Sequence, residues 1–149
     1  MKVFLTGATG VMGRSAAGAL LDAGHEVGGL ARSQVKATEL QDVGVRPVIG
    51  SLFDPATLTA AFQGYDVVCN LATHIPVGAA GVLPGSWRTN DRIRVEGSRS
   101  VAEAAKRAGV LRVVQESVSF VYADGGDDLL DESSPLMVTR ATEPVAEAE

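Results

Sequence analysis

A glycine-spaced loop near the start of the chain constrains the fold more than any other feature. Gly7, Gly10 and Gly13 follow an apolar run at residues 3–5 and lead into a helical pattern of small residues at 15–23. A strand that breaks at glycines and restarts as a helix leaves unpaired backbone N–H groups at the helix N-terminus. These groups and the helix dipole attract anions. The sequence therefore predicts an anion site made of backbone amides.

Each glycine has its own physical role in such a loop. Gly7 allows a sharp turn, Gly10 lets a pyrophosphate approach the backbone, and Gly13 lets the helix lie close to the strand. The preceding strand and the following helix pattern strengthen this interpretation. The alternative is a tight turn that binds no ligand.

Strand and helix patterns alternate along the chain, which is typical of a parallel sheet with helices on both faces. We expect strands at residues 2–6, 26–31, 46–49, 66–71 and 111–118, and helices at 11–23, 34–43, 55–64 and 87–108. These elements predict a three-layer α/β/α Rossmann fold, a doubly wound parallel sheet in the order 3-2-1-4-5. Pro47 fits the edge position of the third strand, because proline cannot donate to a ladder.

Composition narrows the possible classes of protein. With 149 residues the chain forms one domain at most. It has no apolar run near the roughly 18 residues of a membrane span, and its start does not resemble a signal peptide. We therefore expect a cytoplasmic protein without a membrane partner. Cys69, the single cysteine, lies in an apolar strand pattern and is expected to be a buried, inert thiol rather than a nucleophile.

Charge is distributed unevenly along the chain. Residues 1–123 carry 12 basic and 10 acidic side chains, whereas residues 124–149 carry 1 basic and 8 acidic ones. The first part shows no basic face of the kind that binds nucleic acid, so no nucleic-acid partner is expected. The acidic tail is expected to have little structure of its own.

The spacing Gly-x-x-Gly-x-x-Gly, with Thr6 before it and Ala8 and Thr9 within it, resembles the extended and atypical short-chain dehydrogenase/reductase families. These families include the NAD-dependent epimerase/dehydratase type. The resemblance runs to about residue 123 and implies an NAD(P)-binding Rossmann domain at 1–123. Residues 124–149 would begin an incomplete substrate-side region. Extended members are much longer, so we expect a fragment of a longer protein or a chain completed by a partner.

The resemblance also implies where the cofactor is bound. Ser51 stands where the families usually offer an aspartate to the adenine amino group, so that contact is weakened or passes to the backbone at Leu52. A small-residue run after the fourth strand would line the nicotinamide ribose. The implied cofactor-binding residues are Gly7, Thr9, Gly10, Val11, Met12, Gly13, Arg32, Ser33, Ser51, Leu52, Leu71, Ala72 and Thr73.

The end of the second strand indicates which nicotinamide cofactor is preferred. A carboxylate there would accept a hydrogen bond from the ribose 2′-hydroxyl and repel a 2′-phosphate, whereas an arginine does the opposite. Residues 29–33 contain no carboxylate, and Arg32 could clamp the phosphate with Ser33 as a second donor and Lys36 one turn further along. The sequence therefore favours NADP over NAD. Arg32 could instead be an ordinary surface side chain or stack on adenine without selecting a cofactor.

The usual catalytic residues of these families are incomplete here. The families use a Tyr-x-x-x-Lys pair and a serine at the end of the fifth strand. No lysine follows Lys106, and the serine position falls on Val118. Strand alternation would let only one of the flanking Ser117 and Ser119 point correctly. These two serines and Tyr122 are the candidate catalytic residues, and no metal site is expected.

The expected long helix at 87–108 departs from the family in one further position. Arg94 stands where an asparagine often precedes Val-x-Gly. The charged side chains of this helix are most simply a solvated face; they are Arg92, Arg94, Glu96, Arg99 and Glu103. Related proteins often pair through this helix, which allows a homodimer. The Gly/Pro-rich segment at 72–86 is long enough to be a lid or a binding loop.

Three hypotheses about function follow. The first is an NADP-favouring oxidoreductase or epimerase-like protein that transfers a hydride at a carbonyl or hydroxyl carbon of a small-molecule substrate. The second is a non-catalytic NAD(P)-sensing regulatory or scaffold protein, which the missing Tyr-Lys pair favours. The third is a nucleotide-sugar epimerase or dehydratase, which would have to retain NAD tightly and is disfavoured by Arg32.

Overall fold

A single parallel sheet forms the centre of the protein. The computed structural model describes residues 1–83 and 85–149. The strands are β1 Lys2–Thr6, β2 Glu26–Ala31, β3 Arg46–Ile49, β4 Val67–Asn70 and β5 Arg112–Gln115. They run in the order β3-β2-β1-β4-β5 and all pair in parallel, which confirms the predicted Rossmann fold. Pro47 lies on edge strand β3, as expected.

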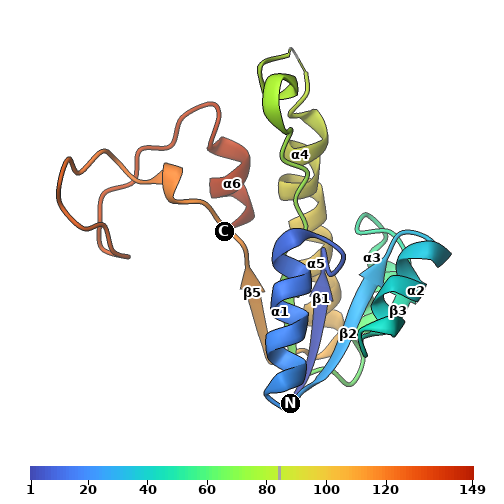
Figure 1. The fold of residues 1–149 in the computed structure, drawn as a ribbon. Coiled ribbons are helices and arrows are strands. Elements are labelled where there is room, and N and C mark those ends of the chain that lie inside the picture. The colour runs from blue at the N-terminus through green and yellow to red at the C-terminus, as the bar shows by residue number, and fades with distance from the viewer. Residues whose placement is uncertain (84) are drawn as a thin grey trace.

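Helices cover both faces of this sheet. In Figure 1, α1 lies in front of the sheet and α5 behind it. The helices are α1 Val11–Asp22, α2 Gln34–Asp42, α3 Pro55–Phe62, α4 Arg88–Arg92, α5 Ser98–Ala108 and α6 Glu143–Ala148, with short 3-10 turns η1 Gly78–Val82 and η3 Ser119–Val121. A π-helical turn, η2 Ile93–Gly97, joins α4 to α5, so the predicted helix at 87–108 is continuous.

Alternating side chains of β1 divide the core into two clusters. Val3 and Leu5 point to the face covered by α1 and α2, and Phe4 points to the face covered by α3 and α5. The Phe4 ring packs edge-on against Phe62 and Tyr65, with centroids 5.1 and 5.2 Å apart. Burial of these rings against the middle strand holds α3 to the sheet.

The predicted fifth strand is too long at its carboxyl end. We expected residues 111–118, but β5 ends at Gln115. Its partner β4 ends at Asn70, whose carbonyl accepts the N–H of Glu116 at 3.0 Å. Beyond that bond β5 has no neighbouring strand with which to pair, so the chain leaves the sheet.

The acidic tail is more ordered than expected. It loops away from the sheet and returns, so that α6 lies beside the upper part of the long helix (Figure 1). Tyr122 and Leu136 form an antiparallel bridge, and Val145 of α6 is buried. Arg99 of α5 pairs with Glu147 at 2.8 Å. The expectation of little structure is therefore wrong for α6, because one buried apolar side chain and this ion pair hold it against the long helix.

Two glycines of α1 provide a matched test of how closely the helix approaches the sheet. A Cβ at Gly13 would lie 2.2 Å from the Gly7 carbonyl oxygen, whereas a Cβ at Gly18 would have nothing within 4 Å. We expect Gly13→Ala to lower the free energy of unfolding by about 1–3 kcal/mol, the usual cost of overpacking. Gly18→Ala should raise it by about 0.5–1 kcal/mol through helix propensity. Urea denaturation measures both, and a neutral Gly13→Ala would contradict the tight contact.

Candidate functional site

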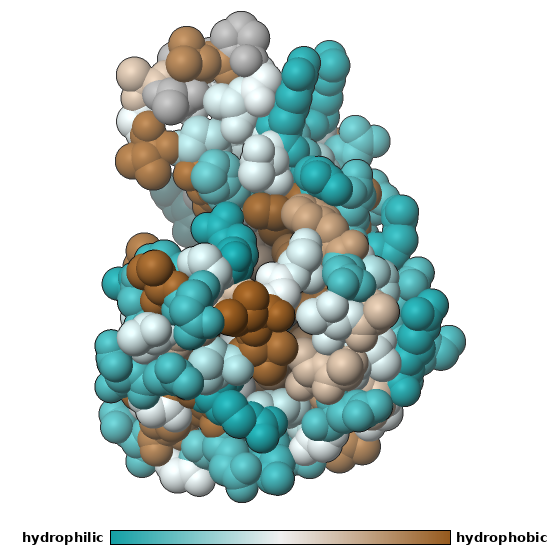
Figure 2. Space-filling view, turned by 90° about the vertical axis from the view of Figure 1, so that its right-hand side faces the viewer, coloured by the Kyte–Doolittle hydropathy of each residue, from teal (hydrophilic) through white to brown (hydrophobic). Residues whose placement is uncertain are grey.

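The segments that follow the five strands meet at the carboxyl edge of the sheet, the upper edge in Figure 1. The strand order reverses between β1 and β4, and such a switch point is where parallel sheets leave a binding crevice. From the side of α2 and α3, the surface is hollowed beneath the projecting segment that carries η1 and α4 (Figure 2). The predicted cofactor-binding residues all lie on segments at this edge.

The glycine loop has the geometry of an anion site. Gly7 has φ +65°, and a Cβ on it would lie 2.5 Å from the carbonyl oxygen of Leu71, so the loop rests directly on the segment after β4. Gly10 is the N-cap of α1, and no side chain of the described residues caps this helix. Val11 and Met12 in the first turn are exposed. The first amides of α1 are therefore open to a ligand, without a carboxylate in that turn to compete.

Arg32 and Ser33 lie at the end of β2, where a 2′-phosphate would be bound. Both are exposed. Ser33 is the N-cap of α2, and its hydroxyl oxygen accepts the N–H of Lys36 at 3.4 Å. The hydroxyl proton of Ser33 can still be donated to an anion. The pair fits the predicted phosphate site, although Lys36 is already engaged.

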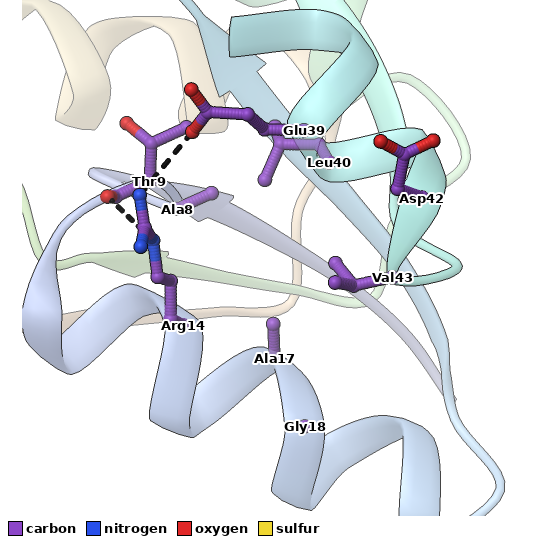
Figure 3. Close-up of a pocket in the computed structure, with 9 residues that line it drawn as sticks. All are labelled: Ala8, Thr9, Arg14, Ala17, Gly18, Glu39, Leu40, Asp42 and Val43. Carbon is purple, nitrogen blue, oxygen red and sulfur yellow. Dashed lines mark hydrogen bonds and ion pairs between the residues drawn. The ribbon is translucent and has the colours of Figure 1, made fainter.

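Lys36 belongs to a charged cluster that sequence analysis did not identify. Its ammonium group lies 2.7 and 2.9 Å from the two carboxylate oxygens of Glu39. Arg14 reaches the same carboxylate at 3.2 Å and donates to the carbonyl oxygen of Thr9 at 3.1 Å (Figure 3). The hydrogen bond from Lys36 lowers the pKa of the Glu39 carboxyl below its usual value, so Glu39 is ionised at neutral pH.

This cluster borders a cavity of about 580 Å³ between α1 and α2. The lining residues are Ala8, Thr9, Arg14, Ala17, Gly18, Glu39, Leu40, Asp42 and Val43. Figure 3 shows Arg14 and Glu39 beside Thr9 of the glycine loop, and Asp42 and Val43 at the carboxyl end of α2. The cavity therefore begins beside the glycine loop.

The predicted adenine position offers mainly backbone groups. Leu52 is buried, and the helix passes so close that a Cβ on Gly97 would lie 2.6 Å from its Cδ2 atom. Ser51 is exposed, and its hydroxyl oxygen accepts the N–H of Phe53 at 3.2 Å. The Leu52 side chain belongs to the core, so only its backbone is available to a base.

The segment after β4 is anchored to the long helix. Leu71, Ala72 and Thr73 are half-buried beside the glycine loop. The N–H of the exposed His74 donates to the buried side chain of Asn90 at 3.1 Å. This contact ties the start of the expected lid at 72–86 to α4; Pro84, within that predicted loop, lies outside the described residues.

The three candidate catalytic residues are not gathered into one constellation. Ser117 is exposed and donates its hydroxyl to the carboxylate of Glu149. Ser119 is exposed at the start of η3, and Tyr122 is half-buried at the backbone bridge to Leu136. No hydrogen bond links these three side chains to one another in the described part of the chain. The alternation argument for the serines fails, because the segment after Gln115 is not a strand.

A buried polar network beneath the carboxyl edge was missed by sequence analysis. Asn70, the last residue of β4, accepts a hydrogen bond from the Thr6 hydroxyl. Its amide donates to Ser98 of α5 at 3.2 Å and to Gln115 of β5 at 2.8 Å. The network thus links β1, β4, β5 and the long helix. The sequence contained one signal that could have indicated this network, which is the polar Asn70 at the end of an otherwise apolar strand.

The network continues into a buried ion pair. Gln115 donates to the Glu116 carbonyl at 2.9 Å, and Arg94 donates to the Glu116 carboxylate at 3.1 Å. The side chains of Arg94 and Glu116 are 2% and 8% exposed. Arg94 therefore does not belong to the solvated face predicted for this helix. It turns inward because a carboxylate leaving the end of β5 is there to neutralise it.

Other charged side chains of the helix are exposed, as expected. Arg92 pairs with Glu96 at 2.8 Å on the surface, and its guanidinium group also lies 4.1 Å from the centre of the Phe53 ring. Arg107 pairs with Glu103 at 3.4 Å in the same solvated setting. Among the described arginines Arg92, Arg94, Arg99 and Arg107, only Arg94 pairs with a buried carboxylate.

Cys69 is the single cysteine of the chain, and it lies on β4. Cys69 is half-buried rather than fully buried, and burial raises the pKa of its thiol, which keeps it protonated. Within residues 1–83 and 85–149, no three His, Cys, Asp or Glu side chains gather as potential ligands of one metal ion. None of the helices in this part is long and apolar enough to span a bilayer.

Known proteins resemble the chain in sequence and in fold. A family model described as NAD(P)H-binding matches residues 7–148. The 3-diazoavenalumate denitrifying reductase of a Streptomyces species is 34% identical over 140 residues, which cover 93% of this chain and 44% of the reductase. A 4-hydroxy-2-methyl-3-oxo-4-farnesyl-3,4-dihydroquinoline-1-oxide ketoreductase of Stigmatella aurantiaca is 34% identical over 137 residues, which cover 91% of this chain and 39% of the ketoreductase.

A solved structure extends the comparison. A short-chain dehydrogenase/reductase superfamily protein from Agrobacterium tumefaciens, crystallised with bound NAD, superposes with a TM-score of 0.76 at 26% identity. The superposition covers 99% of this chain and 43% of that protein. The chain thus spans less than half the length of each of these three relatives.

The buried ion pair generates a test with a matched control. Arg94→Met leaves the Glu116 carboxylate buried without its partner, and we expect a loss of about 3–5 kcal/mol in the free energy of unfolding. Arg99→Met removes an exposed pair on the same helix and should cost about 1 kcal/mol or less. Urea denaturation compares the two, and adding Glu116→Leu to Arg94→Met should restore most of the loss. Equal effects of the two single variants would refute the role of burial.

Proposed function

The chain belongs to the NAD(P)H-binding family, within the short-chain dehydrogenase/reductase superfamily, and we propose that it is the cofactor-binding portion of an NADP-preferring oxidoreductase. The observation that carries the proposal is the start of α1 at Gly10, which no side chain of the described residues caps, at the same edge of the sheet as Arg32, the residue after β2. In this proposal residues 1–123 form the dinucleotide-binding domain, and residues 124–149 begin the substrate-side region.

Charge supports NADP rather than NAD. Arg32 is exposed at the end of β2, and residues 29–33 contain no carboxylate that would repel a 2′-phosphate. A planar guanidinium group can make two parallel hydrogen bonds to a phosphate, and the Ser33 hydroxyl can add a third. A 2′-hydroxyl would find no negatively charged acceptor in this window.

The glycine loop and the segment after β4 would hold the rest of the dinucleotide. The amides of Val11, Met12 and Gly13 would bind the pyrophosphate, with Gly7 and Gly10 allowing its approach and Thr9 completing the loop. The backbone at Ser51 and Leu52 would face the adenine, and Leu71, Ala72 and Thr73 would line the nicotinamide ribose. The bound nicotinamide would supply or accept a hydride.

The reaction proposed is hydride transfer at a carbonyl or hydroxyl carbon of a small molecule. Two of the relatives are named as reductases, which supports oxidoreductase chemistry. Ser117, Ser119 and Tyr122 are hydroxyl-bearing residues on the segment that follows β5. We assign these three candidate catalytic residues to orienting the substrate oxygen. The chain lacks the Tyr-x-x-x-Lys pair, so in this proposal the proton that accompanies the hydride is exchanged with water.

A non-catalytic NAD(P)-sensing protein is the second candidate, and the missing Tyr-Lys pair favours it. The two candidates differ in turnover rather than in cofactor binding. Oxidation of NADPH by the full-length gene product, measured at 340 nm with a panel of aldehydes and ketones, separates them. Steady turnover of any carbonyl supports the reductase, whereas nucleotide binding without turnover supports the sensor.

Location and assembly form the last part of the proposal. We place the protein in the cytoplasm, where NADPH is available, and propose that a homodimer forms through the helix at 87–108. In this chain α6 lies along the η2 part of that helix and Arg99 is paired with Glu147. A second copy would therefore contact the remaining surface of α5.

The cofactor preference is tested at Arg32. Arg32→Ala should weaken NADPH binding about tenfold or more, because it removes a charge-assisted hydrogen bond to the phosphate, and should leave NADH affinity nearly unchanged. Arg112→Ala is the matched control, since Arg112 is exposed at the amino end of β5, at the edge of the sheet opposite to the proposed cofactor site. Calorimetric titration with both nucleotides measures the ratio of NADPH affinity to NADH affinity. If Arg32→Ala leaves this ratio unchanged, Arg32 does not belong to the phosphate site.

A further inference from the structure

Glu39 holds two cations that lie between the glycine loop and the end of β2. Its carboxylate accepts both hydrogen bonds from Lys36, at 2.7 and 2.9 Å, and one from Arg14 at 3.2 Å. Arg14 is fixed at its other side by the carbonyl oxygen of Thr9 (Figure 3). The cluster is thus attached to the glycine loop itself.

The position of the cluster relates it to the proposed phosphate site. Lys36 lies in the first turn of α2, three residues after the N-cap Ser33, and Arg14 lies in the first turn of α1. Both helices begin at the carboxyl edge, and α2 begins two residues after Arg32. Lys36 is half-buried with a long flexible side chain, so its ammonium group can move between Glu39 and an anion at the start of α2.

A carboxylate and a phosphate compete for the same partners. Glu39 is ionised, and its negative charge repels a second anion while it offsets part of the positive charge of Lys36 and Arg14. A 2′-phosphate would have to draw Lys36 away from this carboxylate. A cofactor with only a 2′-hydroxyl requires no such exchange, so Glu39 acts on one cofactor and not on the other.

We propose that Glu39 is a specificity-determining residue that restrains the preference for NADPH by competing with the 2′-phosphate for Lys36. The inference rests on the proposed dinucleotide function, and it adds a residue outside the loops to which binding was assigned. Arg32 and Ser33 attract the phosphate, and Glu39 limits how much the neighbouring Lys36 adds to that attraction. The chain would therefore use both cofactors more evenly than its arginine at the end of β2 suggests.

The test is Glu39→Gln, which keeps the shape of the side chain and removes its charge. We expect NADPH affinity to rise about two- to fivefold, the range that one partly exposed charge interaction supplies. NADH affinity should change by less than that. Glu26→Gln is the matched control, because Glu26 is exposed near the amino end of β2, where it pairs with Lys2 at 3.4 Å. Both nucleotides are titrated calorimetrically against each purified variant.

A second variant tests the mechanism. Lys36→Met should lower NADPH affinity and leave NADH affinity unchanged. Glu39→Gln should raise NADPH affinity less in the Lys36→Met background than in the wild type, because the ammonium group for which the carboxylate and the phosphate compete is then absent. A gain of equal size in both backgrounds would overturn the assignment to Lys36.

The outcomes separate this inference from the function on which it rests. If the wild-type chain binds NADPH but Glu39→Gln leaves the NADPH-to-NADH ratio unchanged or lowers it, the role of Glu39 is wrong and the proposed function stands. If the folded wild-type chain binds neither nucleotide, both fall together.

Discussion

Direct contact between backbone segments at the glycine loop is the constraint on which the rest of the structure depends. The Gly7 carbonyl lies where a Cβ on Gly13 would be, and Gly7 itself touches the backbone at Leu71. Helix α1 can therefore start immediately above β1, and the segment after β4 can pass beside it. The same closeness leaves the first amides of α1 facing the crevice. Packing and the proposed anion binding thus have one physical origin, which is the absence of side chains at two positions.

Below that loop, the carboxyl edge is held by polar rather than apolar contacts. Asn70 joins three strands to α5, and Arg94 and Glu116 extend the network to the helix that precedes α5. Burial of an ion pair is expensive unless its geometry and hydrogen bonds are complete, so such a pair contributes to positioning more than to net stability. Here it fixes the turn at which the chain leaves β5 and leads to Ser117. The exposed amides of α1 lie on the β1 side of the carboxyl edge, and the buried polar network lies on the β5 side.

Sequence patterns predicted most of the strands and the helices between them, because the determinants of these elements are local. Apolar runs at residues 3–5 and 67–69, the glycines after β1, and the Asp54 cap with Pro55 each act within a few residues. The end of β5 was missed because a strand continues only while it has a neighbour, and the length of β4 set that limit. Helix α6 was missed because its stability comes from contact with the long helix, and the acidic composition around it indicates a solvated tail.

The strand, glycine turn and helix at the start of the chain could be located from sequence, since their signals occur in one continuous stretch. The Arg94–Glu116 pair and the Arg14–Glu39–Lys36 cluster could not, because each joins residues on different elements whose distance depends on how helices lie on the sheet. The sequence by itself determined the succession of strands and helices along the chain and the place of the glycine loop, because short-range backbone preferences and hydrophobic period specify them. Only the tertiary structure decided which charges are buried, which are paired and which remain free, because those properties depend on neighbours that are distant in the chain.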